Sequence, residues 1–299
     1  MFCCDDKHPS DLLEKGHIDF NVREAIRQGV DPIVAVKVAC HHAARYFLLN
    51  NRGAIAPGYL ADFVVIDNFQ AFNILQVFKK GEELYDGRTV RDFASPEIDP
   101  YLTEKAHDTF HLSRLTAEDF AERRPRGIIG MVPGEIVTVD QGYSDHIDAE
   151  WDILKIAVIE RHKNTRHIGV GYLQGYGLKR GAVATSVSHD SHNIIVVGAN
   201  EADMAAAANR VAENKGGIVV MEDGQIKGEV VLAIAGLMSD DTLEHVNRDL
   251  EAAKDAAFAL GVSREIDPFM TLSFMSLPVI PTLRLTTRGV IDVAKQQYV

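Results

Sequence analysis

Cysteine is scarce in this sequence: there are three in 299 residues, and two of them, Cys3 and Cys4, are neighbours. Three thiols cannot form a disulfide framework, and their spacing lacks the paired arrangement of a structural zinc site. The third thiol, Cys40, stands alone. Cysteine usage therefore argues against a secreted disulfide scaffold and favours a protein of the reducing cytoplasm.

Basic residues are also in deficit. Lys and Arg number 31 against 43 Asp and Glu, which gives a formal net charge of -12 and a pI near 5.4. A protein that binds a nucleic acid backbone needs clustered Lys and Arg to neutralise the phosphates, and the sequence has no such cluster. We therefore expect no nucleic acid partner.

Long apolar runs are absent as well. No segment approaches the roughly 18 residues that a membrane span needs, and no basic stretch followed by an apolar core begins the chain. We expect a cytoplasmic protein with no membrane partner. A composition of 46% hydrophobic and 25% charged residues is typical of globular domains, and the length is sufficient for two or three of them.

The first part of the chain has the pattern of a strand end followed by helices. Residues 2–4 are a short apolar run that leads into two adjacent carboxylates, as in a buried parallel strand that ends at the mouth of a barrel. Asp31-Pro32 is a capping residue followed by proline at the first helical position, and residues 33–46 have helical periodicity. This order is typical of the last unit of a β/α barrel.

The middle of the chain changes to short β-strands, which we expect at residues 62–66, 74–79 and 84–85. Residues 86–118 carry few periodic apolar positions and predict a linker, part of which can be helical. The domain boundaries that follow are a barrel segment at 1–52, part of a small β-sandwich at 53–92, a linker at 93–117 and a further domain at 118–299.

The last domain alternates strands with helices, which predicts an α+β fold with a mixed sheet. Asn200 is expected to cap one helix, Asp223-Gly224 is a two-residue hairpin signal, and Asp240 is expected to cap a long second helix that reaches residue 260. The strands expected from β-branched residues are 153–159, 182–187, 194–198, 218–221 and 225–232.

The adjacent carboxylates Asp5 and Asp6 are the first candidate site. A carboxylate at a strand end can bind a metal and exchange a proton with a metal-bound water, because the metal lowers the pKa of that water. The alternative for this pair alone is a surface role, in a helix cap or an ion pair. His17 follows shortly after and is a secondary candidate for substrate binding.

The second candidate site is the polar run Ser188-His189-Asp190-Ser191-His192, which lies between two predicted strands. Two imidazoles three residues apart can orient a ring through its nitrogens or supply a proton to a leaving amine. The alternative is a polar loop whose side chains bind its own backbone.

Several blocks of the sequence resemble known families. The segment Gly53 to Ile66 resembles the pattern with which amidohydrolases leave their barrel and return to a small β-sandwich. The rest of the chain is similar to the C-terminal half of bacterial adenine deaminases. The blocks that carry this second resemblance are Cys4-Asp5-Asp6, Gly16-His17-Ile18-Asp19, Val158 to Arg161, Ala184 to Ile194, Ile234 to Ser239 and Ser276 to Pro281.

This resemblance implies hydrolysis of adenine to hypoxanthine and ammonia at a binuclear centre of manganese or iron. Asp5 would be a metal ligand and proton carrier, Asp6 a carboxylate near the substrate, and His189 or His192 the group that faces a ring nitrogen. Ser188, Asp190 and Ser191 would line the substrate site.

The other metal ligands of the family precede the part of the family pattern that this chain matches. We therefore expect the chain to be inactive alone, and either to form a homo-oligomer or to associate with a missing N-terminal half. The alternative is a non-catalytic homologue that acts as a purine-binding or assembly subunit.

Overall fold

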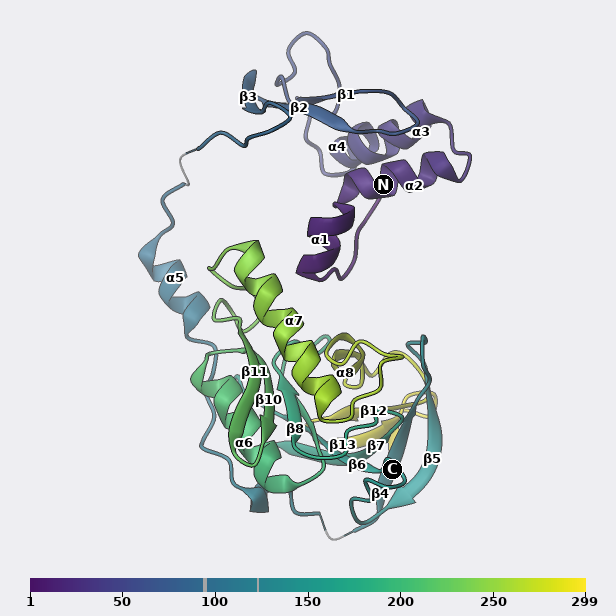
Figure 1. Cartoon of the computed structure of the whole chain (residues 1–299), viewed down its shortest axis with the longest axis vertical. Coiled ribbons are helices and arrows are strands. Elements are labelled where there is room, and N and C mark those ends of the chain that lie inside the picture. The colour runs from purple at the N-terminus through teal and green to yellow at the C-terminus, as the bar shows by residue number, and fades with distance from the viewer. Residues whose placement is uncertain (94–95, 123) are drawn as a thin grey trace. The chain divides into compact units, whose positions relative to one another are not determined.

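The structure is a computed structural model that describes residues 1–93, 96–122 and 124–299, so two positions of the expected linker 93–117 and one of the expected domain 118–299 lie outside the described residues. The chain divides into two units, Met1–Glu97 and Ile98–Val299. Each unit is described below by itself (Figure 1).

The first unit combines a group of short helices with a small sheet. The sheet is antiparallel in the order β1-β2-β3 and confirms the three expected strands. Its helices and strands are α1 (Pro9–Lys15), α2 (Ile18–Arg27), α3 (Pro32–Lys37), the π-helical turn η1 (Val38–His42), α4 (Ala43–Tyr46), β1 (Phe63–Ile66), β2 (Ile74–Lys79) and β3 (Glu82–Tyr85).

The Asp31 signal is confirmed in this unit, and a second carboxylate, Asp62, makes a further contact. The Asp31 carboxylate accepts hydrogen bonds from the backbone N–H groups of Ile33 and Val34, at 2.9 and 3.1 Å, and so caps α3. Asp62, at the return to the sheet, pairs with Arg52 and accepts a hydrogen bond from the N–H of Lys80 at 2.8 Å. The segment that resembles amidohydrolases is thereby fixed to the β2–β3 turn.

The strand expected at residues 2–4 is wrong. This segment has no regular structure, Cys3 is exposed, and its carbonyl accepts a hydrogen bond at 2.9 Å from the side chain of Asn21 on α2. A strand needs a neighbouring strand to pair its N–H and C=O groups. The strands described in this unit pair only with one another, so the apolar run has none to join.

The second unit is built around a mixed sheet, as expected from the sequence. The sheet has eight strands, in the order β11-β10-β8-β9-β6-β7-β4-β5, of which the sequence predicted five and missed β4, β5 and β7. Neighbouring strands are antiparallel except β4 and β7, which are parallel. The strands are β4 (Arg126–Met131), β5 (Thr138–Ser144), β6 (Leu154–Ile159), β7 (Ile168–Gln174), β8 (Ala182–Thr185), β9 (Ile194–Gly198), β10 (Gly217–Glu222) and β11 (Gln225–Val231).

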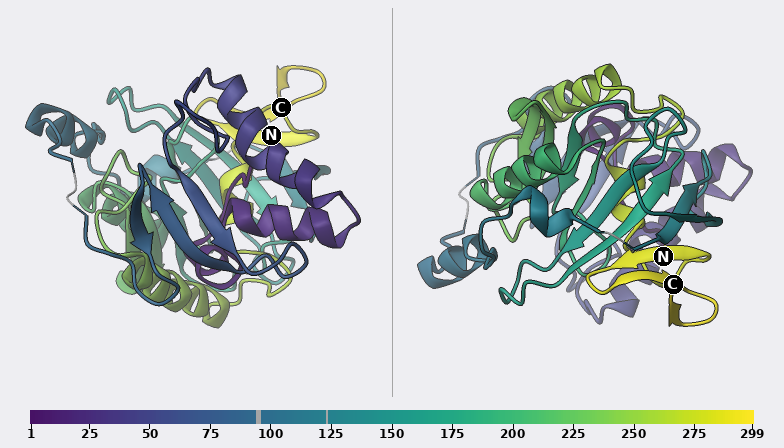
Figure 2. Two further views of the ribbon diagram at one scale, coloured as in Figure 1. Left: turned by 90° about the horizontal axis from the view of Figure 1, so that it is seen from above. Right: turned by 90° about the horizontal axis from the view of Figure 1, so that it is seen from below.

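Further helices and a second, small sheet complete this unit (Figure 2). The small sheet is antiparallel, in the order β12-β13-β14, and packs against the large sheet through β12 and β13. These elements are α5 (Pro100–His107), the 3-10 turn η2 (Ala117–Phe120), α6 (Glu201–Glu213), α7 (Leu243–Ala259), α8 (Met270–Phe274), β12 (Leu283–Thr286), β13 (Gly289–Asp292) and β14 (Gln297–Tyr298).

Two hydrophobic clusters cover the two faces of the large sheet. Ile156 and Val158 of β6 belong to one cluster, together with side chains of α7 and α8. Ala157 and Ile159 belong to the other, together with side chains of α6. Because successive residues of a strand point to opposite faces, the central strand is buried on both sides, which explains its continuous apolar sequence.

Helix α6 and the β10–β11 hairpin follow the sequence signals. The Asn200 side chain accepts a hydrogen bond from the N–H of Asp203 at 2.8 Å, and Glu222 pairs with Gln225 across the Asp223-Gly224 turn.

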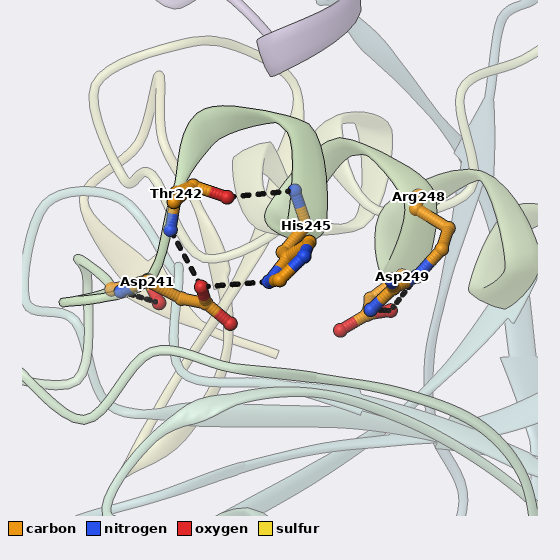
Figure 3. Close-up of polar contacts among 6 residues, drawn as sticks. Asp241, Thr242, His245, Arg248 and Asp249 are labelled. Carbon is orange, nitrogen blue, oxygen red and sulfur yellow. Dashed lines mark hydrogen bonds and ion pairs between the residues drawn. The ribbon is translucent and has the colours of Figure 1, made fainter.

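The expected cap of α7 is wrong by two residues (Figure 3). The cap is Thr242 rather than Asp240, because its hydroxyl accepts a hydrogen bond from the N–H of His245, three residues on, at 3.3 Å. Asp241 accepts a hydrogen bond from the N–H of Thr242 and lies 3.0 Å from Nδ1 of His245.

The glycine-rich segment 169–177 forms most of β7. A Cβ atom at Gly169 would lie 1.9 Å from the carbonyl oxygen of Thr286, and one at Gly171 would lie 2.5 Å from the side chain of Val290. Glycine is therefore required where β7 meets the β12–β13 hairpin. No helix among the described residues has the length and apolar composition to cross a membrane.

Candidate functional site

The loop 186–193, which joins β8 to β9, carries five of the predicted site residues. It is fixed through its backbone: the N–H of His192 donates to the carbonyl of Ser188 at 2.7 Å, and the N–H of His189 donates to the carbonyl of Ser273 at 3.1 Å. The second of these bonds joins the loop to α8. The loop is therefore held at both its start and its end.

Ser188 anchors the loop in the interior. Ser188 is fully buried, and its hydroxyl lies 2.6 Å from the hydroxyl of Ser276. The Ser276 hydroxyl donates a hydrogen bond to the carbonyl of His189 at 2.9 Å. The hydrogen bonds of Ser188 are thus made with the protein. Contact between Ser188 and a substrate stays a prediction.

The two histidine rings of the loop lie together. Their centroids are 5.7 Å apart, and the ring of His189 also stacks on Phe274 of α8 at 4.9 Å. The Asp190 side chain is exposed and places a carboxylate oxygen 3.7 Å from Nδ1 of His189. The Nδ1 atom of His192 is buried and has no hydrogen-bond partner among the described residues. Loop 186–193 therefore combines packed aromatic rings with a buried imidazole nitrogen that has no partner among the described residues.

Arg161, at the end of β6, is the residue that sequence reasoning did not single out. Its guanidinium is 1% exposed and stacks over the ring of Phe110. Nε donates to the carbonyl of His192 at 2.6 Å, Nη1 to that of Thr109 at 2.8 Å and Nη2 to that of Ala235 at 2.9 Å. A single buried side chain therefore joins three segments that are distant in the sequence.

The turn after β6 makes a further contact with the loop. Nε2 of His162 lies 2.9 Å from the carbonyl oxygen of Ser191, and the amide of Asn193 donates to the hydroxyl of Ser191 at 3.1 Å. Ser191 itself is exposed.

Burial and charge lower two pKa values at this site. Burial lowers the pKa of Arg161 to about 10, which leaves the guanidinium charged at neutral pH. The pKa of His192 is lowered first by burial and then by the positive charges of His189 and Arg161, against a smaller opposite effect of Asp190. The His192 imidazole is therefore neutral at pH 7 and can accept or donate a hydrogen bond through Nδ1, according to its tautomer.

The other predicted site residues belong to the first unit. Asp5 has a backbone φ of 51°, and its carboxylate accepts a hydrogen bond from the N–H of Asp6 at 3.0 Å. His17 is exposed before the first turn of α2, where its N–H donates to Asp19 at 2.7 Å. Asp5 and Asp6 are both exposed.

The described residues do not form a metal centre by themselves. Nowhere in the described part of the chain do three or more His, Cys, Asp or Glu side chains come together in a way that could hold a metal ion. A hydrolytic metal site needs several such ligands. Manganese or iron therefore does not fit a site made by these residues alone, and Asp5 can be one ligand at most.

Comparison with known proteins identifies the family of the chain. Residues 134–297 match the family described as adenine deaminase C-terminal domain, and residues 1–84 match the amidohydrolase family. The chain belongs to the adenine deaminase family.

The relatives found in this family resemble the chain over nearly its whole length. The adenine deaminase of Desulfatibacillum aliphaticivorans is 44% identical over 98% of the chain and 52% of the relative. Adenine deaminase 1 of Rhizobium etli is 43% identical over the same shares, and the adenine deaminase of Nitratidesulfovibrio vulgaris is 41% identical over the same shares. The chain thus spans about half the length of the curated relatives it matches.

Replacement of Arg161 by alanine should lower the free energy of unfolding by about 3 kcal/mol, because a buried side chain is removed and three partly buried carbonyls lose their donor. Urea unfolding followed by circular dichroism measures this loss. Arg248, which is exposed and pairs with Asp249, is the control, and its replacement by alanine should change stability by less than about 0.5 kcal/mol. Equal losses for both variants would contradict the anchoring role of Arg161.

The lowered pKa of His192 predicts a dependence of stability on pH. The folded protein binds this proton less readily than the unfolded chain, whose value is 6.5, so protonation favours unfolding as the pH falls below that value. The variant His192→Asn, which suits the backbone φ of 48° at this position, should lose less stability than the wild type between pH 7 and pH 5. Urea unfolding at several pH values tests this, and parallel curves for the two proteins would refute it.

Proposed function

We propose that this chain supplies the C-terminal portion of an adenine deaminase, which hydrolyses adenine to hypoxanthine and ammonia. The observation that carries the proposal is the convergence of four separate sequence blocks of the family on loop 186–193. Arg161, the loop itself, residues 234–236 and Ser276 come from these four blocks and are joined by the hydrogen bonds given above.

The two histidines are assigned to the purine. Displacement of the amino group breaks the bond between carbon 6 and nitrogen and forms a bond from carbon 6 to oxygen, so negative charge builds up on the ring and a hydrogen-bond donor at a ring nitrogen stabilises it. His192, with its unused Nδ1, faces that nitrogen. His189, whose Nδ1 lies 3.7 Å from the Asp190 carboxylate, gives a proton to the departing ammonia.

The carboxylates of the first unit complete the proposal. Asp5 would carry a proton and would be one ligand of a divalent metal, manganese or iron, whose further ligands would come from a partner polypeptide. Asp6 and His17 line the substrate side of the same site. Of these residues, Asp5 is best prepared for the role, because the N–H of Asp6 already orients its carboxylate.

A second candidate function is a non-catalytic subunit that binds purine or assists assembly. The lack of a group of three metal ligands among the described residues favours it. The two candidates differ in one respect: loop 186–193 would bind adenine in both, but hydrolysis would occur only in the first, when a partner supplies the missing ligands.

Exposed apolar side chains support an association with a partner. The end of the helical segment in the first unit exposes Tyr46, Phe47 and Leu48 by 71%, 61% and 77%, and Ile55 is 87% exposed shortly after it. Large apolar side chains exposed to this extent are typical of an interface when they gather in one patch. We assign this surface, residues 46–48 with Ile55, to contact with a second copy of the chain or with a separate N-terminal half.

A chimaera tests the catalytic proposal. The chimaera consists of the adenine deaminase of Desulfatibacillum aliphaticivorans in which this chain, residues 1–299, replaces the half that it matches. The chimaera should hydrolyse adenine in the presence of manganese, whereas the chain alone should not. His189→Ala and His192→Asn should each lower kcat/KM by about 10- to 100-fold. Replacement of His146, an exposed histidine paired with Asp145, by alanine is the control and should leave kcat/KM unchanged.

The chimaera experiment separates the two candidate functions. An active chimaera with unaltered turnover in both histidine variants would remove the roles of His189 and His192. A chimaera that binds adenine in a calorimeter but never hydrolyses it would favour the non-catalytic subunit.

The association proposal predicts that the chain alone is larger than a monomer in solution. Sedimentation velocity should show a dimer or higher oligomer, and Phe47→Ser should shift it toward the monomer, because the exposed ring contributes apolar area to the interface. Tyr143→Ser is the matched control, because the Tyr143 side chain is also 61% exposed. A monomeric wild-type chain would argue against self-association and leave only the separate N-terminal half.

A further inference from the structure

The second unit holds a pocket that is separate in its lining residues from loop 186–193. Its volume is about 270 Å³, and it lies between the segment 112–119 and the turn that joins β6 to β7. The side chains of Leu115, Ile159 and Ile168 form an apolar floor. Polar side chains from the two segments surround this floor, as in many sites for small molecules.

Two arginines of this pocket have no partner. Arg114 and Arg166 both line it, and neither makes a hydrogen bond, ion pair or ring contact within the described part of the chain. About half of the arginines in the described part of the chain pair with a carboxylate, as Arg126 and Arg210 do, so one arginine without a partner carries little information, whereas two that meet at one pocket carry more. Two guanidinium groups without partners at one pocket are therefore a signal of a ligand.

The two carboxylates of the pocket are already occupied. Glu160 accepts hydrogen bonds from the N–H groups of His162, Lys163 and Thr165, at 2.6, 2.9 and 3.0 Å. Partial burial acts to raise the pKa of Glu160, but these bonds outweigh it and lower the pKa. Asp119 accepts hydrogen bonds from the N–H and the hydroxyl of Thr116, at 2.7 and 3.0 Å. Neither carboxylate forms an ion pair with Arg114 or Arg166 in the described part of the chain.

The same hydrogen bonds give the pocket a fixed wall. Asn164 accepts hydrogen bonds from the N–H and the hydroxyl of Ser113, at 3.0 and 3.2 Å, and so ties the β6–β7 turn to the segment that carries Arg114. Arg166 has a backbone φ of 58°, a conformation that Glu160 helps to hold by ordering the turn before it. The two guanidinium groups are thus carried by segments that are joined to each other.

We propose that this pocket binds a small organic molecule that carries a terminal oxyanion, either a phosphate or a carboxylate. The planar fork of arginine matches both groups through paired N–H donors. The apolar floor would hold the body of the ligand. The net charge of -12 argues against an extended phosphate-binding surface, but two local guanidinium groups suffice for one oxyanion.

Isothermal titration calorimetry of the full chain with adenosine monophosphate, citrate and inorganic phosphate tests the proposal. We expect a dissociation constant of about 0.1 mM for at least one organic probe and weaker binding of inorganic phosphate, which lacks a body for the apolar floor. Binding of the nucleotide indicates an organic phosphate, and binding of citrate indicates a carboxylate. The measurement needs no turnover, so its result is independent of the deaminase proposal.

Variants assign the binding to the pocket. Arg114→Ala and Arg166→Asn, the latter chosen because asparagine tolerates positive φ, should each weaken binding about tenfold. Arg88→Ala is the matched control, because Arg88 is exposed and also lacks a side-chain partner among the described residues, and it should bind as the wild type does. The proposal is overturned if no probe binds below about 10 mM, or if both pocket variants bind with wild-type affinity.

Discussion

The buried guanidinium of Arg161 is the constraint on which the candidate site depends. A charge removed from water is costly unless hydrogen bonds replace its hydration, and here three carbonyls from distant segments supply that replacement. Because the guanidinium is planar and its donors have fixed directions, the carbonyls must keep their relative positions. The conformation of loop 186–193 is therefore coupled to the end of β6, and the same positive charge helps to keep His192 neutral.

The parts of the fold that the sequence predicted correctly rest on short-range chemistry. Asp31 and Asn200 cap helices by binding N–H groups two or three residues away, and Asp223-Gly224 closes a hairpin between adjacent strands. The strand β7 was not predicted, because its glycines Gly169 and Gly171 are required by the approach of β12 and β13, which lie more than a hundred residues later. The strand predicted at residues 2–4 was wrong because its apolar pattern indicated a strand, but a strand also requires a neighbouring strand to pair with.

The candidate site likewise has one part that the sequence pattern predicts and one part that it does not. The polar loop could be predicted because it interrupts two apolar strands, and its residue types indicate proton transfer and binding. The groups that hold it could not, since Ser276 contacts Ser188 across 88 residues and Arg161 reaches His192 across 31. Local pattern carries no information on such pairs. A buried arginine after an apolar strand was the available signal, and its meaning depends on which carbonyls surround it.

The end of β6 also explains why two sites occur so close together in the sequence. Glu160 and Arg161 directly follow Ile159, the last residue of β6; Arg161 binds the carbonyl of His192 in loop 186–193, while Glu160 lines the pocket of Arg114 and Arg166. Glu160 organises the following turn through backbone N–H groups, and His162 of that turn contacts the loop at Ser191. The arrangement of both sites thus follows from two adjacent residues, one that buries a positive charge among carbonyls and one that binds amide hydrogens with a negative charge.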